Sequence, residues 1–234
     1  MMQEAVILAG GKGTRLQSVI KDVPKPMAIV AERPFLTYLL EKLSKNGVQK
    51  VVLSVGYKYE VILDYFGQRY KNITIEYAVE ETPLGTGGGI KLAMKKCDTP
   101  NILVLNGDTF FDVSLKDFCT FHESQNFDVS IALKQMENPS RYGTVKLEQN
   151  HISEFKEKDE TLKMGHINAG VYCFKKDFFL KNTPNGSFSL EEQFLQKEVA
   201  KSGFGGYAEE AYFIDIGIPE DYQKANQYFE QIKF

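Results

Sequence analysis

Tryptophan is absent from this chain of 234 residues, and cysteine and histidine occur only three times each. The cysteines are far apart and odd in number: Cys97, Cys119 and Cys173. Their spacing is not that of metal ligands, so we expect reduced thiols. The histidines His122, His151 and His166 likewise show no spacing typical of a metal site or a catalytic relay. We expect His122 to lie on a helix surface.

Long apolar runs and an excess of positive charge are also missing. No run approaches the ~20 residues that a membrane-spanning helix needs. The first residues lack the basic and apolar regions of a signal peptide. Lys and Arg number 28 against 31 Asp and Glu, a net charge of -3, so no basic surplus indicates a nucleic-acid partner. We therefore expect a cytoplasmic protein without a membrane or nucleic-acid partner.

The most informative stretch is the first one. Residues 5–9 form an apolar run of buried-strand length, which ends in the glycine-rich sequence GGKG at 10–13. Glycines let a ligand lie against the backbone, and successive free N–H groups can bind an anion. Arg15 and Lys25, the latter between two prolines, add positive charge near the carboxyl end of the strand. The glycine spacing fits neither the Rossmann nor the P-loop motif, so an ordinary turn remains an alternative.

Hydrophobic periodicity predicts alternating strands and helices up to residue 127. After the first strand we expect a helix from Pro34 to a C-cap at Gly47, and then the following elements. They are a strand at 48–55, a helix at 59–70, a strand at 73–79, a glycine-rich loop at 80–89, a helix at 90–96, a strand at 102–105 and a helix at 115–123 capped by Ser114. This alternation predicts a parallel sheet with right-handed crossovers.

The pattern changes beyond residue 128, where strands are separated by turns instead of long helices. We expect strands at 129–133, 142–147, 152–155 and 167–174, which favours an antiparallel addition to the sheet. A capping box at 189–192 predicts a helix to Val199, and Pro219 begins a closing helix. No linker separates the halves, so we expect one domain over 1–234 with two sub-regions, 1–127 and 128–234.

Three acidic positions differ in what their surroundings indicate. Asp108 follows a predicted strand, and because Ser114 is the expected helix cap, the aspartate is available for a ligand. Asp215 lies between apolar residues, which directs its carboxylate inward, where it needs a cation or donors. Glu157 lies in the polar run KEKDE, and its surroundings alone favour a solvated charge cluster.

Together these segments resemble the sugar-1-phosphate nucleotidylyltransferases. The resemblance rests on LAGGKGTRL with PKPM, the glycine-rich segment at 85–89, NGD at 106–108, RYGTV at 141–145, FKEK at 155–158, NAGVY at 168–172 and IDIGIP at 214–219, in the family's order. Ile218 stands where the family has threonine. The resemblance implies an α/β fold: a Rossmann-like, three-layer α/β/α nucleotidyltransferase fold, GT-A-like, with a mostly parallel mixed sheet.

The family's functional residues fall on matching positions, and the resemblance implies a nucleotide-binding half at 1–127 and a sugar-phosphate-binding half at 128–234. The resemblance implies Arg15 and Lys25 as catalytic residues and Asp108 and Asp215 as Mg²⁺ ligands. It implies nucleotide contacts at Leu8, Ala9, Gly10, Gly11, Gly13, Thr14, Glu80, Glu81, Pro83, Gly85, Thr86, Gly87, Asn106 and Gly107. It implies sugar-phosphate contacts at Gly143, Glu157, Lys158 and Asn168, although Lys156 and Lys163 are close alternatives to Lys158.

The implied reaction joins an NTP to a sugar 1-phosphate and releases pyrophosphate. Such chemistry depends on positioning and charge neutralisation, and it needs no general base because the attacking phosphate is already ionised. Arg15 would hold the β- and γ-phosphates, Lys25 the α-phosphate and Lys158 the sugar phosphate.

The expected base is guanine, because a carboxylate at Glu80 or Glu81 suits its two adjacent donors. Within the family the chain is most similar to the D-glycero-D-manno-heptose 1-phosphate guanylyltransferases. Mannose-1-phosphate guanylyltransferases, uridylyl- or thymidylyltransferases acting on N-acetylmuramate or glucose 1-phosphate, and a catalytically silent nucleotide-sugar sensor remain alternatives. A homo-oligomer is compatible with the sequence.

Overall fold

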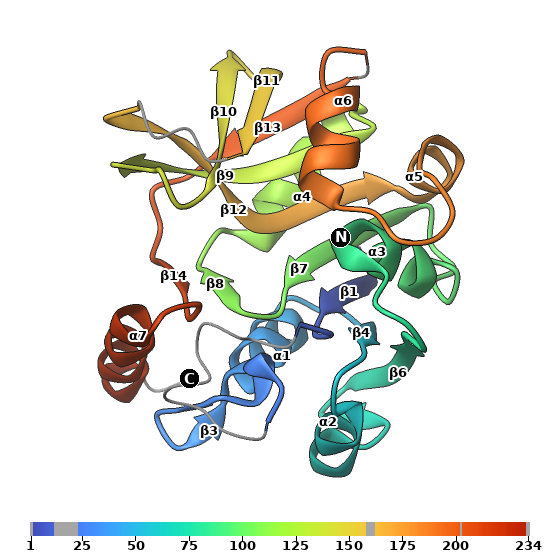
Figure 1. The fold of residues 1–234 in the computed structure, drawn as a ribbon, viewed down its shortest axis with the longest axis vertical. Coiled ribbons are helices and arrows are strands. Elements are labelled where there is room, and N and C mark those ends of the chain that lie inside the picture. The colour runs from blue at the N-terminus through green and yellow to red at the C-terminus, as the bar shows by residue number, and fades with distance from the viewer. Residues whose placement is uncertain (1, 12–22, 158–161, 202, 233–234) are drawn as a thin grey trace.

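In the described part of the chain, a mixed sheet of ten strands runs through the molecule (Figure 1). The computed structural model describes residues 2–11, 23–157, 162–201 and 203–232. In chain order the strands of this sheet are β1 (Glu4–Leu8), β4 (Lys50–Val55), β5 (Arg69–Tyr70), β6 (Ile73–Val79), β7 (Asn101–Asn106), β9 (Val129–Glu137), β10 (Gly143–Glu148), β11 (His151–Glu157), β12 (Met164–Lys175) and β13 (Phe204–Ala208). Their spatial order is β10-β11-β13-β9-β12-β7-β1-β4-β6-β5.

Helices and two short strand pairs surround this sheet. The helices are α1 (Phe35–Lys45), α2 (Tyr59–Phe66), α3 (Gly85–Met94), α4 (Leu115–Gln125), α5 (Lys176–Asn182), α6 (Gln196–Glu198) and α7 (Pro219–Gln231). A 3₁₀ turn, η2 (Lys25–Met27), and a π-helical turn, η3 (Leu190–Leu195), complete them. The strand pairs are β2 (Ile29–Val30) with β3 (Arg33–Pro34), and β8 (Thr109–Phe111) with β14 (Phe213–Asp215). No helix in the described part of the chain is long and apolar enough to cross a membrane.

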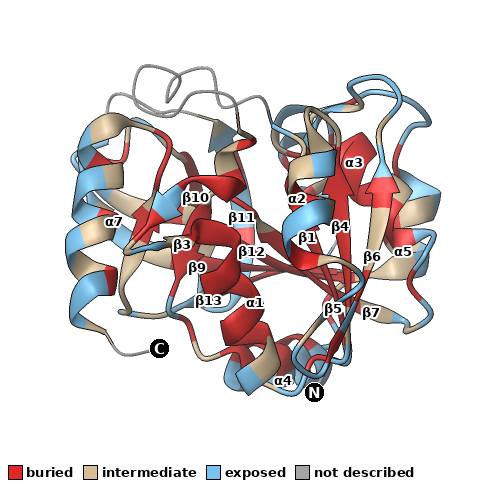
Figure 2. Cartoon of the chain, turned by 90° about the horizontal axis from the view of Figure 1, so that it is seen from below, coloured by how far each residue is buried: buried red, intermediate tan, exposed pale blue. Residues whose placement is uncertain are grey.

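Both faces of the sheet are covered, which gives three layers. Along β1, Ala5 and Ile7 join the core under α1, α2, α4 and α7, whereas Val6 joins the core under α3 and α5. Alternate residues of a strand point to opposite faces, so an apolar run such as β1 is what a strand between two helical layers requires. Figure 2 shows these buried strands between helices whose outer sides are exposed.

The predicted fold class is confirmed, and the sheet is mixed. Strand β1 lies parallel to β4 and β7, and β4 lies parallel to β6, as the alternating pattern predicts. Beyond β7 only β13 pairs in parallel, with β9. Strands β10, β11 and β12 pair antiparallel with their neighbours. The expectation of mostly parallel pairing therefore holds only for the first half of the chain.

Two predicted element boundaries are wrong. Helix α2 ends before Gly67, which adopts φ 59° and donates its N–H to Leu63, so that Arg69 and Tyr70 form the edge strand β5 instead of a last helical turn. The glycine-rich segment is not a loop, because α3 already begins at Gly85.

The glycines of α3 are there because other parts of the chain pack directly on the helix backbone. A Cβ on Gly87 would lie 2.1 Å from the ring of Phe188. A Cβ on Gly88 would lie 2.6 Å from the carbonyl oxygen of Gly186. Glycine costs about 1 kcal/mol against alanine in a helix interior, and here the close approach of residues 186–188 requires it.

His122 is buried, contrary to the expectation of a surface position. The side chain is 1% exposed, and its Nδ1 lies 2.8 Å from the Ser130 hydroxyl of β9. Burial, assisted by the charge of Lys175, lowers the pKa of His122 to about 4, so the ring is neutral at neutral pH. The three cysteines are free and buried, in agreement with the expected reduced thiols.

A Gly87→Ala substitution tests the packing on α3. We expect the free energy of unfolding to fall by about 1–3 kcal/mol, because the new methyl group must displace the Phe188 ring. The matched control is Gly11→Ala, where a Cβ meets no atom within 4 Å. Urea unfolding of both variants measures the difference. Equal stability of the two variants would contradict this packing.

Candidate active site

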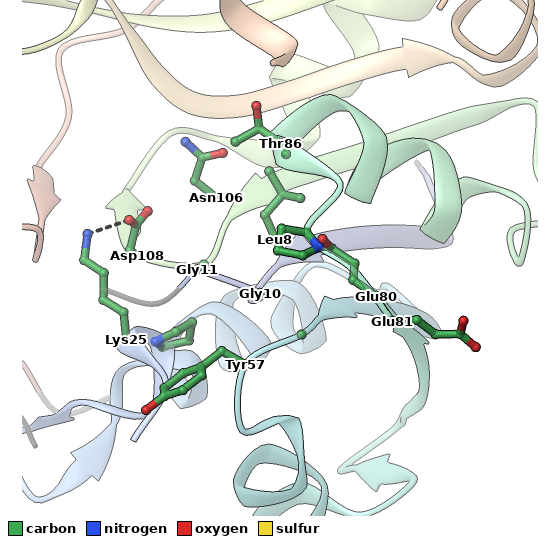
Figure 3. A pocket seen from close by; sticks show the side chains of 15 residues that line it. Leu8, Gly10, Gly11, Lys25, Tyr57, Glu80, Glu81, Thr86, Asn106 and Asp108 are labelled. Carbon is green, nitrogen blue, oxygen red and sulfur yellow. Dashed lines mark hydrogen bonds and ion pairs between the residues drawn. The ribbon is translucent and has the colours of Figure 1, made fainter. Parts of the chain in front are cut away.

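A cavity of about 690 Å³ opens at the carboxyl ends of β1, β4 and β7. Neighbouring parallel strands end together here: Leu8 is in register with Ser54 of β4 and with Asn106 of β7. The cavity is lined by Leu8, Gly10, Gly11, Lys25, Pro26, Gly56, Tyr57, Glu80, Glu81, Pro83, Gly85, Thr86, Asn106, Gly107 and Asp108 (Figure 3). This edge is where open α/β sheets bind ligands.

Most of the predicted nucleotide residues are brought together in this lining. Two of them are not: Ala9 is 1% exposed in the core, and Gly87 packs against Phe188. Gly13, Thr14, Arg15 and Lys158 lie outside the described residues, so their roles remain predictions. Sequence reasoning missed Pro26, Gly56 and Tyr57. The signal for Gly56 and Tyr57 was available, because they follow a strand that ends beside β1.

The floor of the cavity is formed by closely spaced backbone. Gly107 donates its N–H to the carbonyl oxygen of Leu8 at 2.9 Å. A Cβ on Gly107 would lie 2.3 Å from that oxygen, so only glycine fits between the ends of β1 and β7. Gly10 lies beside Gly56 and the carboxylate of Glu80. The glycine positions therefore allow β1, β4 and β7 to present their backbone to one cavity.

Glu80 holds the turn that follows β6. Its Oε1 accepts a hydrogen bond from the Ser54 hydroxyl at 3.1 Å, and its Oε2 accepts one from the N–H of Leu84 at 2.9 Å. Glu80 is thus tied to β4 and to the entry of α3. Glu81, by contrast, is exposed, and Figure 3 shows its carboxylate turned away from Glu80.

Lys25 joins two carboxylates from distant parts of the chain. Its Nζ lies 2.5 Å from Oδ2 of Asp108 and 3.4 Å from Oδ1 of Asp215. Asp108 follows β7, and Asp215 ends β14, where it pairs with Thr109 of β8. Lys25 begins η2, between Pro24 and Pro26, which restrict its backbone.

The ammonium group of Lys25 offsets the repulsion between the two carboxylates. Burial opposes the charged form of Lys25, but the charges of Asp108 and Asp215 outweigh it and raise the pKa of Lys25. Burial and the charge of Asp108 raise the pKa of Asp215, and Lys25 acts in the opposite direction. The arrangement is therefore a partly buried pair of like charges with one bridging cation, as the inward orientation of Asp215 predicts.

The described members of the predicted sugar-phosphate set, Gly143, Glu157 and Asn168, lie outside the cavity lining, on the second half of the sheet. Gly143 pairs with Glu157 across β10 and β11. Asn168 donates from Nδ2 to the hydroxyl of Tyr172 at 2.8 Å, and its Oδ1 accepts from the N–H of Gly170. A Cβ on Gly170 would lie 2.9 Å from Nδ2 of Asn106, so this group adjoins the cavity through Asn106.

The family model of nucleotidyl transferases matches residues 4–232. The chain belongs to the nucleotidyl transferase family. It is 46% identical to a D-glycero-alpha-D-manno-heptose 1-phosphate guanylyltransferase of Aneurinibacillus thermoaerophilus, over 96% of this chain and 97% of the relative. It is 47% identical to a protein of the same name from Campylobacter jejuni, over 94% and 96% of the two chains.

Two solved structures share this fold. HddC from Yersinia pseudotuberculosis, crystallised with GMP-PN, superposes with a TM-score of 0.85 at 39% identity, covering 97% of this chain and all of that one. A glucose-1-phosphate thymidylyltransferase from Bacillus anthracis, described as putative, reaches a TM-score of 0.89 at 19% identity, which shows the shared fold alone.

The donor set of this nucleotidyl transferase fits a hard divalent cation. Asp108 and Asp215 present carboxylate oxygens to one point, where Lys25 now supplies the positive charge. In the described part of the chain no cluster of three or more His, Cys, Asp or Glu side chains offers a complete protein cage. Mg²⁺ is commonly bound by one or two carboxylates together with substrate phosphates and water. The two aspartates therefore suit a metal that binds with a nucleotide.

The pH dependence of the stability of Lys25→Met tests the ion pairs of Lys25 with the two aspartates. At pH 7.5 we expect the free energy of unfolding to fall by about 1–2 kcal/mol, because two partly exposed carboxylates lose their cation. Lys25 has a raised pKa, so its contribution is complete below the unfolded value of 10.5 and is lost only at more alkaline pH. Asp215 has a raised pKa and becomes protonated as the pH falls toward 3.8, so the loss should shrink toward acid.

The measurement is urea unfolding at pH 7.5 and pH 4.5. The control is Lys146→Met, which removes an exposed lysine paired with Glu148 and should change nothing. An equal loss for Lys25→Met at both pH values would contradict the account of repelling carboxylates.

Proposed function

We propose that the chain transfers GMP from GTP to D-glycero-α-D-manno-heptose 1-phosphate, forming GDP-heptose and pyrophosphate. One observation carries this proposal: two relatives with that name are 46% and 47% identical over nearly the whole of both chains. The similarity to HddC, crystallised with GMP-PN, supports a guanine nucleotide as the donor. The cavity at the ends of β1, β4 and β7 would take up that nucleotide.

The residues around the cavity suit charge neutralisation during the transfer. Asp108 and Asp215 would hold Mg²⁺, which when bound supplies positive charge to the phosphate oxygens. Lys25 reaches both aspartates, so its ammonium lies where the α-phosphate would meet the metal site. No histidine lines the cavity among the described residues, which agrees with an attacking phosphate that needs no general base.

The two halves of the chain would bind the two substrates. Every described residue that lines the cavity lies between 8 and 108, so we assign the nucleotide to the half at 1–127. We assign the sugar phosphate to 128–234, with contacts at Gly143, Glu157 and Asn168 and with Lys158 as its cation. In support, Gly170 on β12 approaches Asn106 closely, which places the Asn168 segment beside the nucleotide cavity.

Guanine recognition is proposed for a carboxylate at the rim of the cavity. Glu80 already accepts hydrogen bonds from Ser54 and Leu84, so its oxygens are engaged in shaping the turn. Glu81 also lines the cavity and is exposed. Because guanine presents two adjacent donors, the Glu81 carboxylate would accept from both once its side chain turns from the outward orientation in Figure 3 toward the cavity. Glu81 is therefore the preferred base-reading residue of the two.

A mannose 1-phosphate acceptor is the second candidate. The chain is 35% identical to a mannose-1-phosphate guanylyltransferase of Mycobacterium tuberculosis, but it spans only 63% of that relative. This relative uses the same class of reaction and differs in the sugar. A homo-oligomeric state and a cytoplasmic location stay predictions from the sequence.

Pyrophosphate release tests the proposal directly. Four NTPs are each combined with heptose, mannose, glucose and N-acetylmuramate 1-phosphates in the presence of Mg²⁺. We expect release with GTP and heptose 1-phosphate, because the full-length relatives share that pair. Release with UTP or dTTP instead would contradict the carboxylate argument for guanine. Nucleotide binding without release for any sugar would favour the silent sensor.

The metal assignment predicts a large effect of two substitutions. Asp108→Asn and Asp215→Asn should each lower kcat by about 10²–10³-fold, because each removes a charge that positions the phosphates and metal. Asp112→Asn is the matched control, since Asp112 pairs with Lys42 instead and should retain kcat within about twofold. Steady-state rates at saturating Mg²⁺ measure this. Equal loss in all three variants would overturn the assignment.

A further inference from the structure

A segment from the second half of the chain is docked on the start of α3. Residues 183–189 connect α5 to η3, and their backbone forms hydrogen bonds to the start of α3. The N–H of Phe188 donates to the carbonyl of Leu84 at 2.9 Å, and the N–H of Gly87 donates back to the carbonyl of Phe188 at 3.0 Å. Gly85, with φ +69°, has no room for a Cβ beside the same carbonyl oxygen, which would lie 2.6 Å away.

The far end of this segment is fixed by a buried lysine. Lys91 of α3 is 8% exposed, and its Nζ donates to the carbonyl of Thr183 at 2.7 Å and to that of Pro184 at 3.1 Å. An ammonium group is costly to bury unless its hydrogens are satisfied. Together with the backbone bonds of Phe188, these two bonds attach the segment to α3 near both of its ends.

Thr86 is the point where the segment meets the nucleotide cavity. Its hydroxyl donates to Oε2 of Glu191 at 2.8 Å and accepts from the N–H of Leu190 at 2.8 Å. Thr86 itself lines the cavity (Figure 3). A hydroxyl has only one hydrogen to donate, and here it is given to Glu191. Thr86 therefore offers the nucleotide no hydroxyl proton while this contact holds.

Glu191 is itself held in place. Its Oε2 accepts a second hydrogen bond from the Ser189 hydroxyl at 3.1 Å, and Ser189 also caps the N–H of Glu192. The carboxylate is half-buried at the beginning of η3. A carboxylate that accepts from two hydroxyl groups is a strong, directional anchor. Glu191 therefore connects η3 to Thr86, which lines the cavity.

We propose that Glu191 is a positioning residue for the nucleotide. By holding Thr86, it fixes the start of α3, and with it Gly85 and Thr86, in the lining of the cavity. Glu191 acts through Thr86 and does not contact the substrate. This inference rests on the proposed function, since it takes the ligand of the cavity to be GTP.

The experiment compares Glu191→Ala with Glu191→Gln and Thr86→Val. Glu191→Ala should raise the KM for GTP about tenfold, with the KM for heptose 1-phosphate within about twofold, because only the nucleotide side loses its anchor. Glu191→Gln should stay near wild type, because the amide oxygen still accepts from Thr86 and Ser189. Thr86→Val should match Glu191→Ala, and the double variant should be no worse than either single one.

Glu192→Ala is the matched control, since the side chain of Glu192 is exposed and next in sequence. It should leave both KM values unchanged. A rise in the KM for heptose 1-phosphate alone in Glu191→Ala would overturn the proposal, because Glu191 would then contact the sugar. A lower melting temperature with both KM values unchanged would also overturn it, because the contact would then be only structural.

Calorimetric titration of GTP with Mg²⁺ separates this inference from the proposed function. If the wild type binds GTP but transfers it to no sugar phosphate, the proposed function fails. The dissociation constant of GTP for Glu191→Ala still tests the positioning role, with an expected increase of about tenfold. An unchanged dissociation constant would overturn the inference whatever the reaction is.

Discussion

The contact of Lys25 with Asp108 and Asp215 is the interaction on which the rest of the site depends. These residues are 83 and 190 positions from the lysine in sequence, so the contact joins three distant segments. Two carboxylates at one partly buried point repel each other, and burial adds to the cost. A cation is therefore needed whenever both are ionised, and Lys25 supplies it in the structure described. The pairing of β8 with β14 brings Asp215 to the end of β7, where Asp108 lies.

A second set of contacts connects the halves on the other side of the cavity. The glycines of α3 remove side chains from the helix surface, which lets residues 186–188 bond to its backbone. Thr86 and Glu191 extend that docking to the cavity lining. The cavity is thus lined by residues of the first half, while the contacts of Lys25 with Asp215 and of Thr86 with Glu191 reach the second half. In the proposed reaction these contacts would hold the two substrates in a fixed position relative to each other.

Much of this arrangement can be predicted from the sequence. The apolar run before the glycines and the strand before Asp108 predict that these two groups lie at one sheet edge, because parallel strands end together. The apolar flanks of Asp215 predict only that its carboxylate points inward, and the antiparallel pairing of β14 with β8 brings it beside Asp108. The start of α3 at Gly85 could not be predicted, since low helix propensity is overcome here by packing against Phe188, a residue 101 positions beyond Gly87. The burial of His122 was missed for a similar reason, because its hydrogen-bond partner Ser130 lies on β9, outside α4. The hydrogen bonds of Glu80 with Ser54 and of Thr86 with Glu191 could not be predicted either, because these partners lie 26 and 105 positions away in the chain.

We infer that Asp108, Asp215 and Lys25 surround the place where the nucleotide phosphates are held. The most direct measurement is a crystal structure with a non-hydrolysable GTP analogue and Mn²⁺, with anomalous scattering to locate the metal. We expect a metal peak between the carboxylates of Asp108 and Asp215, with the α-phosphate beside Lys25. A nucleotide bound in the cavity with its metal elsewhere, and with the contacts of Lys25 to both aspartates unchanged, would contradict this inference.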